Sequence, residues 1–129
     1  MTQTPLRRAT SSVLRMNANT LEKDFQAQVI ELAHILGYRI AHFRPAQNSK
    51  GQWRTPVSAD GKGFPDLVLV RPDFNTKGRP KRMIFAELKS NTGRLSKEQG
   101  EWLEDLAGAG VESYLWRPKD WDDIVEILR

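Results

Sequence analysis

The chain has 129 residues, enough for one domain and too short for two ordinary ones. Its apolar share of 39% and charged share of 28% are those of a folded globular protein and exclude an extensively disordered one. The net charge of +4 favours a polyanionic partner only weakly, and the absence of cysteine excludes disulfides, thiolate zinc sites and cysteine nucleophiles. No apolar run is long enough to span a bilayer and no apolar signal core opens the chain, so we expect a soluble, cytoplasmic protein without a membrane partner.

The N-terminal half of the chain predicts an arm, a helix, a strand and a long loop. Residues 1–18 mix Thr, Ser and Arg with little periodicity, and we expect either a flexible basic arm or a frayed terminus ahead of a single domain at 19–129. Apolar residues at helical spacing then predict a helix that begins at Asn19 or Thr20 and stops before Gly37. A strand is predicted at 38–43, and the segment 44–63, rich in Gly, Pro and polar residues, predicts a loop.

The C-terminal half predicts three strands and two helices. The short apolar segments 65–70 and 82–89 predict strands covered on both faces, separated by a turn at 73–81. Ser96 followed three residues later by Gln99 has the spacing of a capping box and predicts a helix whose inner side is Trp102, Leu103, Leu106 and Ala107. A strand at 111–116 and a short helix at 119–128 follow. The order indicates an α/β domain with a mixed β-sheet and helices on its faces.

Two carboxylates are predicted to meet in the hairpin formed by the segments 65–70 and 82–89. Antiparallel pairing around a turn centred near residues 76–77 sets Asp66 opposite Glu87. Directly opposed side chains share one face of the sheet, with Cβ atoms roughly 5 Å apart. Lys89 lies two residues beyond Glu87 and is therefore expected on the same face.

This arrangement suits a metal ion and phosphodiester chemistry. Two carboxylates so close repel each other, and one must take up a proton unless a cation lies between them. Mg²⁺ would relieve the repulsion, with the main-chain carbonyl of Leu88 as a further oxygen ligand. A divalent ion can activate water and neutralise the charge that develops during hydrolysis. Lys89 would orient or help deprotonate that water, or hold the scissile phosphate.

Each of these residues also has an ordinary structural explanation. A Glu-x-Lys on a strand is usually a surface ion pair, and Pro-Asp before a strand is common turn chemistry. Glu22, in the first turn of its predicted helix, is favoured by the helix dipole alone, and the capping box by itself explains Gln99. What favours a site is the convergence of Asp66, Glu87 and Lys89 on one point.

Three segments carry a resemblance to a known family: GFPDLVLV at 63–70, AELK at 86–89 and GRLSKEQGEWLEDLAGAG at 93–110. Together they resemble the PD-(D/E)XK nuclease superfamily, and more closely its VRR-NUC branch, which occurs as stand-alone phage and bacterial proteins and within larger repair enzymes. The likeness runs from Leu21 to about Trp116. It implies a restriction-endonuclease-like core with a central antiparallel hairpin flanked by helices.

The resemblance also implies site residues. Asp66 and Glu87 would hold the metal and Lys89 would be the catalytic lysine. Glu22 would match the family's helical glutamate, which completes the metal or water network, and Gln99 would match a glutamine of the same site.

The activity that the resemblance implies is a Mg²⁺- or Mn²⁺-dependent deoxyribonuclease, with a preference for branched DNA such as Holliday junctions or flaps. Because cutting both strands of a junction needs two active sites, we expect a symmetric homodimer. A phage-encoded protein would act in the cytoplasm of its host. RNA stays open as an alternative substrate, and a nucleic-acid-binding module that keeps the nuclease-like fold without cutting is the alternative function.

Contacts with DNA are predicted at four further residues. Arg94 and Lys97 follow the metal-binding strand closely and are candidates for phosphate contacts. His42 at the end of its strand would contact phosphate or water, although a hydrogen-bonded structural histidine is an equally good interpretation. Arg44, at the start of the long loop, is the fourth candidate.

Overall fold

The computed structural model of the chain describes residues 18–129 apart from 44–45, 48, 55–56 and 73–77, and for 18–21, 46–47 and 53–54 it describes the backbone alone. The predicted N-terminal arm therefore lies outside the described residues, except for Ala18, which begins the first described helix. None of the helices in the described part of the chain is long and apolar enough to cross a bilayer.

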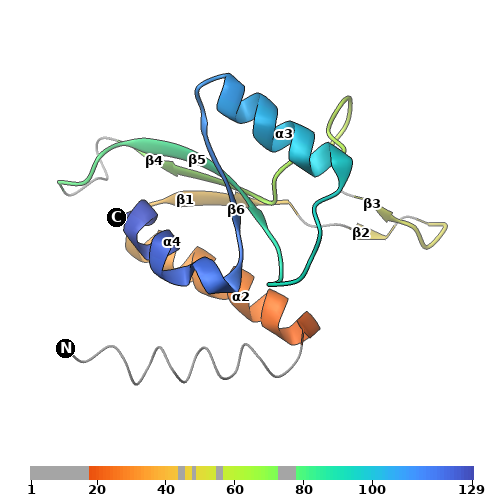
Figure 1. The fold of residues 1–129 in the computed structure, drawn as a ribbon, viewed down its shortest axis with the longest axis horizontal. Coiled ribbons are helices and arrows are strands. Elements are labelled where there is room, and N and C mark those ends of the chain that lie inside the picture. The colour runs from red at the N-terminus through yellow and green to blue at the C-terminus, as the bar shows by residue number, and fades with distance from the viewer. Residues whose placement is uncertain (1–17, 44–45, 48, 55–56, 73–77) are drawn as a thin grey trace.

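A four-stranded mixed sheet lies at the centre of the molecule (Figure 1). The strands are β1 (Arg39–His42), β4 (Leu67–Arg71), β5 (Arg82–Leu88) and β6 (Glu112–Trp116), in the order β1-β4-β5-β6. β4 pairs antiparallel with both β1 and β5, whereas β5 and β6 are parallel and are connected through helix α3 (Lys97–Gly108). The predicted α/β class, with a mixed sheet and a central antiparallel hairpin, is confirmed.

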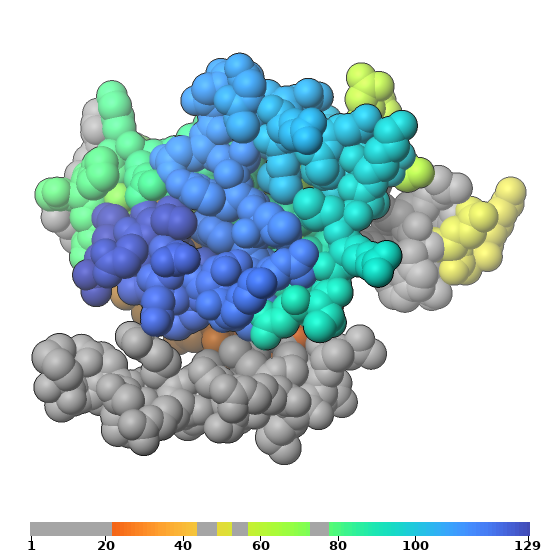
Figure 2. Space-filling model, viewed as in Figure 1, coloured from red at the N-terminus to blue at the C-terminus, as the bar shows by residue number. Residues whose placement is uncertain are grey.

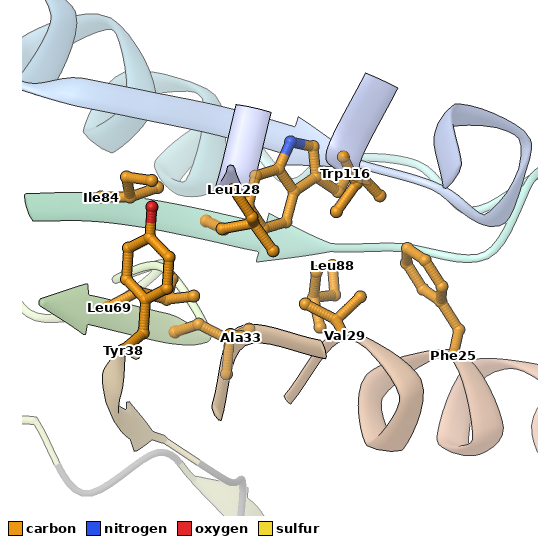
Figure 3. Packing of buried hydrophobic residues seen from close by; sticks show 12 residues of the cluster. Phe25, Val29, Ala33, Tyr38, Leu69, Ile84, Leu88, Trp116 and Leu128 are labelled. Atoms are coloured by element: carbon orange, nitrogen blue, oxygen red, sulfur yellow. The ribbon is translucent and has the colours of Figure 1, made fainter. Parts of the chain in front are cut away.

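Helices α2 (Ala18–Ile35) and α4 (Trp121–Leu128) cover one face of the sheet, and α3 covers the other (Figure 1). Phe25, Val29 and Ala33 recur every four residues along α2, so they form one stripe that is fully buried. Figure 3 shows Val29 and Ala33 pointing from α2 toward β4 and β5. The buried apolar core between these helices and the sheet consists of Phe25, Val29, Ala33, Tyr38, Leu67, Leu69, Ile84, Ala86, Leu88, Trp116, Ile124 and Leu128.

Helix α3 covers its face of the sheet less completely. Trp102, Leu103 and Leu106 are half-buried, whereas Ala107, which was predicted to face inward, is exposed. Val70 and Met83, which pair across β4 and β5, are also exposed, at 37% and 50%. The prediction that both strands are covered on each side therefore holds only for the part of the sheet beneath α3.

The boundaries of three predicted segments differ in the structure. The predicted loop 44–63 contains an antiparallel hairpin of β2 (Ala46–Gln47) and β3 (Trp53–Arg54), whose strands of two residues are too short to show an alternating pattern. The tip of this hairpin, residues 49–52, stands out from the body of the molecule (Figure 2). Because α2 begins at Ala18, Glu22 lies in the second turn of the helix and not, as predicted, in the first. The last α-helix begins at Trp121 because residues 118–120 form a 3₁₀ turn.

Two arginines fasten the C-terminal helix to the sheet. Arg71 is fully buried, lies 4.5 Å from the centre of the Tyr38 ring and donates to four main-chain carbonyl oxygens, those of Leu36, Pro80, Leu128 and Arg129. Arg82 donates to the carbonyl oxygen of Ile127 and to both carboxylate oxygens of Glu112, at 3.0 and 2.6 Å. The bonds to Leu36, Ile127, Leu128 and Arg129 satisfy carbonyl groups at or next to helix ends, which have no partner within their own helices.

Candidate functional site

The register of β4 and β5 brings two carboxylates side by side. Leu67 pairs with Ala86, so the next opposed pair beyond it is Asp66 and Glu87, as the hairpin alignment predicted. The Oδ2 atom of Asp66 accepts a hydrogen bond of 2.9 Å from the main-chain N–H of Leu88, which ties the Asp66 side chain to the end of β5. Because residues alternate along β5, Leu88 enters the core and Glu87 points toward the face that carries α3.

The carboxylate of Glu87 is buried and only half satisfied. Glu87 is 2% exposed, and its Oε2 atom accepts a hydrogen bond of 2.9 Å from the side-chain Nε2 of Gln99. Its Oε1 atom is buried without a hydrogen-bond partner. Burial, and after it the negative charge of Asp66, raise the pKa of Glu87 from 4.5 to about 8, while the charge of Lys89 acts in the opposite direction.

Gln99 serves both the start of α3 and the carboxylate pair. The Ser96 hydroxyl accepts from the Gln99 N–H at 3.1 Å, and Gln99 Oε1 accepts from the Ser96 N–H at 2.8 Å, so the predicted capping box is confirmed. The opposite end of the same amide, Nε2, donates to Glu87. A single position of the Gln99 side chain therefore caps α3 and also contacts the carboxylate pair.

The segment that leads into Asp66 packs against the first turn of α3. Gly63 has a φ of +83°, and a Cβ atom at this position would lie 2.6 Å from the Gln99 nitrogen. Phe64 makes edge-to-face contacts with three aromatic rings, those of Phe43, Phe85 and Trp102. This close packing fixes the distance between the segment carrying Asp66 and the helix carrying Gln99.

Lys89 is half-buried and directly follows β5. Its main-chain N–H donates to the carbonyl oxygen of Trp116 at 3.0 Å, which continues the pairing with β6 by one residue. Lys89 therefore shares a face with Glu87, two residues earlier, as the alternation along the strand predicts.

The remaining predicted residues lie on other elements or outside the described residues. Half-buried Glu22 belongs to α2, the helix on the opposite face of the sheet. In the part of the chain that the structure describes, no three Asp, Glu, His or Cys side chains are grouped closely enough to hold a metal ion, so Glu22 does not join the pair in a cluster. Arg94 is exposed on the segment between Lys89 and α3, and Lys97 is exposed at the first residue of α3. The half-buried His42 ends β1 opposite Leu67, and Arg44 lies outside the described residues.

The donor atoms present suit a hard divalent cation. The partnerless Oε1 of Glu87 and the adjacent carboxylate of Asp66 are oxygen ligands of the kind that such cations prefer. In an extended strand, the N–H and C=O of one residue point to the same side, so the Leu88 carbonyl is directed toward the strand that carries Asp66. Burial and the charge of Asp66 outweigh the charge of Lys89 and raise the pKa of Glu87, so a bound cation would favour the ionised form of this carboxylate.

Two residues near the site were not singled out from the sequence. Gly63 approaches Gln99, and Arg117 binds the turn that follows Lys89. Gly63 escaped notice because it precedes a Phe-Pro pair, which is typical of an ordinary turn. Arg117 escaped notice because more than twenty residues separate it from its partners. No local sequence signal could have identified Arg117.

The chain was also compared with known proteins. The family model for the VRR-NUC domain matches residues 13–119, which include both strands of the hairpin and α3. No curated protein and no solved structure matches the chain. The mixed sheet with flanking helices agrees with the restriction-endonuclease-like fold of this family. The chain therefore belongs to the VRR-NUC family of nucleases.

Proposed function

We propose that this protein is an endonuclease that hydrolyses phosphodiester bonds of DNA with the help of Mg²⁺ or Mn²⁺. The observation that carries this proposal is the buried Oε1 atom of Glu87, which has no partner although the Asp66 carboxylate lies beside it. A buried, unpartnered carboxylate oxygen is costly unless a cation or a proton compensates it. In a nuclease, a cation at that position would also take part in phosphodiester hydrolysis.

Asp66, Glu87 and the main-chain carbonyl of Leu88 would hold the ion. When bound, the ion would supply Lewis acidity, which activates water and neutralises the charge that develops on the phosphate. The Leu88 N–H holds one oxygen of Asp66, and Gln99 holds one oxygen of Glu87, so one oxygen of each carboxylate is left for the ion. These second contacts orient the ligands and limit their rotation.

Lys89 is proposed to act on the water or on the scissile phosphate. Its side chain originates on the same face as Glu87, two residues beyond it. An ammonium at this place can orient the attacking water, assist its deprotonation or stabilise the negative charge of the transition state. We assign Glu22, on α2, a part in the surrounding water network, as the family resemblance implies.

DNA would approach along the exposed segment between β5 and α3. Arg94 on this segment and Lys97 at the first residue of α3 are exposed and would contact the backbone phosphates on either side of the cleaved bond. His42 and Arg44 are proposed to contact the strand on the side of β1. The resemblance to stand-alone family members supports branched DNA as the substrate, and a symmetric homodimer would supply the second active site that two cuts require.

The test is a cleavage assay with labelled Holliday junction, flap, linear duplex and single-stranded RNA of the same sequence. Each substrate is incubated with Mg²⁺, Mn²⁺ or EDTA and the wild-type protein, Glu87→Gln or Lys89→Ala. Glu126→Gln and Lys23→Ala are matched controls, because both residues are exposed and lie on α4 and α2.

We expect metal-dependent cutting of the branched substrates by the wild-type protein and both controls, and none by the two site variants. Binding without cleavage under either metal would support the non-cleaving alternative instead. Cleavage that survives both site substitutions would show that the active site lies elsewhere, and cutting of RNA alone would overturn DNA as the substrate.

A further inference from the structure

Residues 90–93 form a tight turn directly after Lys89. The N–H of Gly93 donates to the carbonyl oxygen of Ser90 at 3.3 Å, which closes the turn. The chain then continues to Ser96, the N-cap of α3, whose first turn carries Gln99. The turn is therefore the first part of the connection between two proposed site residues, Lys89 and Gln99.

The side chain of Arg117 holds this turn. Its Nη1 atom donates to the carbonyl oxygens of Ser90 and Gly93, at 2.6 and 2.7 Å. A second connection comes from the same part of the chain, because the N–H of Lys119 donates to the Asn91 side-chain oxygen at 2.9 Å. Hydrogen bonds from a charged donor are stronger than neutral ones, so Arg117 supplies the strongest of these contacts.

Arg117 is itself fixed in place. It is half-buried and directly follows β6, and its main-chain N–H donates to a carboxylate oxygen of Asp120 at 2.9 Å. The residue before it, Trp116, is 2% exposed and accepts the main-chain N–H of Lys89 at 3.0 Å. Trp116 thus binds the backbone of Lys89, and the next residue, Arg117, binds the turn that follows it.

The turn also lies close to the side chain of Lys89. A Cβ atom built on Gly93, which has none, would lie 3.5 Å from Cδ of Lys89. Gly93 therefore lies beside the alkyl chain that carries the Lys89 ammonium. A shift of the turn would open space beside this alkyl chain and give the lysine side chain more rotational freedom.

From these contacts we propose that Arg117 is a positioning residue for the cleavage reaction. By holding the turn 90–93 against Lys89, it keeps the lysine ammonium directed at the reacting phosphate. This inference rests on the proposed nuclease function. Because small misplacements of a catalytic group cost about 10²-fold in rate, loss of the contact should act on turnover more than on DNA binding.

The test compares Arg117→Ala, Arg117→Lys and, as a matched control, Arg82→Met. Arg82 also binds a main-chain carbonyl, that of Ile127, but does so at the C-terminal end of α4. Single-turnover cleavage at saturating DNA is measured below the unfolding temperature of every variant. DNA affinity is measured separately with Ca²⁺ in place of the catalytic ion, and cleavage by Arg117→Ala is repeated with added methylguanidinium.

For Arg117→Ala we expect a cleavage rate reduced by about 10²-fold, nearly unchanged DNA affinity and partial recovery with methylguanidinium. Arg117→Lys should lose less, because an ammonium can still donate to one carbonyl. Arg82→Met should lower the unfolding temperature and leave the rate of the folded protein unchanged.

Two results would overturn the inference while leaving the nuclease assignment intact. The first is a wild-type rate in folded Arg117→Ala. The second is a loss of rate that Arg82→Met shares and methylguanidinium does not restore. If the wild-type protein cleaves nothing, the proposed function itself fails, and the role of Arg117 fails with it.

Discussion

The side-chain amide of Gln99 donates a hydrogen bond of 2.9 Å to Glu87, and its carbonyl end accepts from the helix cap at Ser96. A glutamate at position 99 could complete the cap equally well but would have no hydrogen to donate to Glu87. One amide thus sets the start of α3 relative to a buried carboxylate on the neighbouring strand. The cap and the candidate metal ligand are parts of one hydrogen-bonded unit.

Removal of this amide should affect stability and activity together. Gln99→Met loses the reciprocal cap contact and the contact to Glu87, whereas Ser96→Ala loses the cap alone. We expect each variant to lose about 1 kcal/mol of unfolding free energy, and only Gln99→Met to show a reduced cleavage rate. Urea unfolding and single-turnover cleavage check this. Equal rate losses in both variants would mean that the cap, and not the bond to Glu87, matters for activity.

The elevated pKa of Glu87 predicts how stability depends on pH in the metal-free protein. Its folded-state pKa is raised from 4.5 to about 8, so between these pH values the folded protein binds more protons than the unfolded chain. The contribution of Glu87 to the free energy of unfolding is therefore retained below the lower value and is lost as the pH rises through about 8. Glu87→Gln should abolish this part of the pH dependence.

A metal ion competes with that proton, so its stabilising effect should grow as the pH rises. The measurement is thermal unfolding of the wild-type protein and Glu87→Gln across this pH range, in EDTA and in Mg²⁺ or Mn²⁺. We expect the metal-induced rise in unfolding temperature to be largest above about pH 8 and to be absent in the variant. A rise that is the same at all pH values would contradict Glu87 as the titrating ligand.

The two lysines near the site should differ in kinetic effect. Lys89→Met should lower kcat by about 10²–10⁴-fold with little change in KM, because the lysine is proposed to act in the transition state. Lys97→Met should weaken DNA binding and leave kcat unchanged. The dependence of DNA affinity on salt concentration should fall by about the amount that one phosphate contact contributes. Cleavage kinetics at several salt concentrations distinguish the two. The assignment of roles would be wrong if the effects were exchanged.

A methyl group at Gly63 should disturb the position of Gln99, although Gly63 is not itself a proposed site residue. Gly63→Ala puts a side chain on a residue with φ of +83° and within 2.6 Å of the backbone of α3. We expect a loss of about 1–3 kcal/mol in unfolding free energy and a reduced cleavage rate, because Gln99 must move away from Glu87. Gly100→Ala is the matched control. It lies inside α3 with nothing within 4 Å of the new Cβ atom and should gain about 0.5–1 kcal/mol with full activity. Similar losses in both variants would refute the close-approach argument.

Features that depend on residues near each other in the chain were predictable from the sequence. The stripe of Phe25, Val29 and Ala33 follows from helical periodicity, and the capping box of Ser96 and Gln99 from a spacing of three residues. Even the opposition of Asp66 and Glu87 follows from local information, because a hairpin's turn and its alternating pattern set the register.

Tertiary structure alone decided the surroundings of these residues. The partnerless oxygen of Glu87 and its raised pKa depend on which atoms from α3 and β4 surround it. That Glu22 forms no metal-holding cluster with the carboxylate pair depends on which face of the sheet α2 covers. Arg117 reaches its partners across 24 and 27 residues of chain. Periodicity, caps and turns are set within a few residues, whereas burial, electrostatics and long-range hydrogen bonds exist only once the sheet and its helices have packed together.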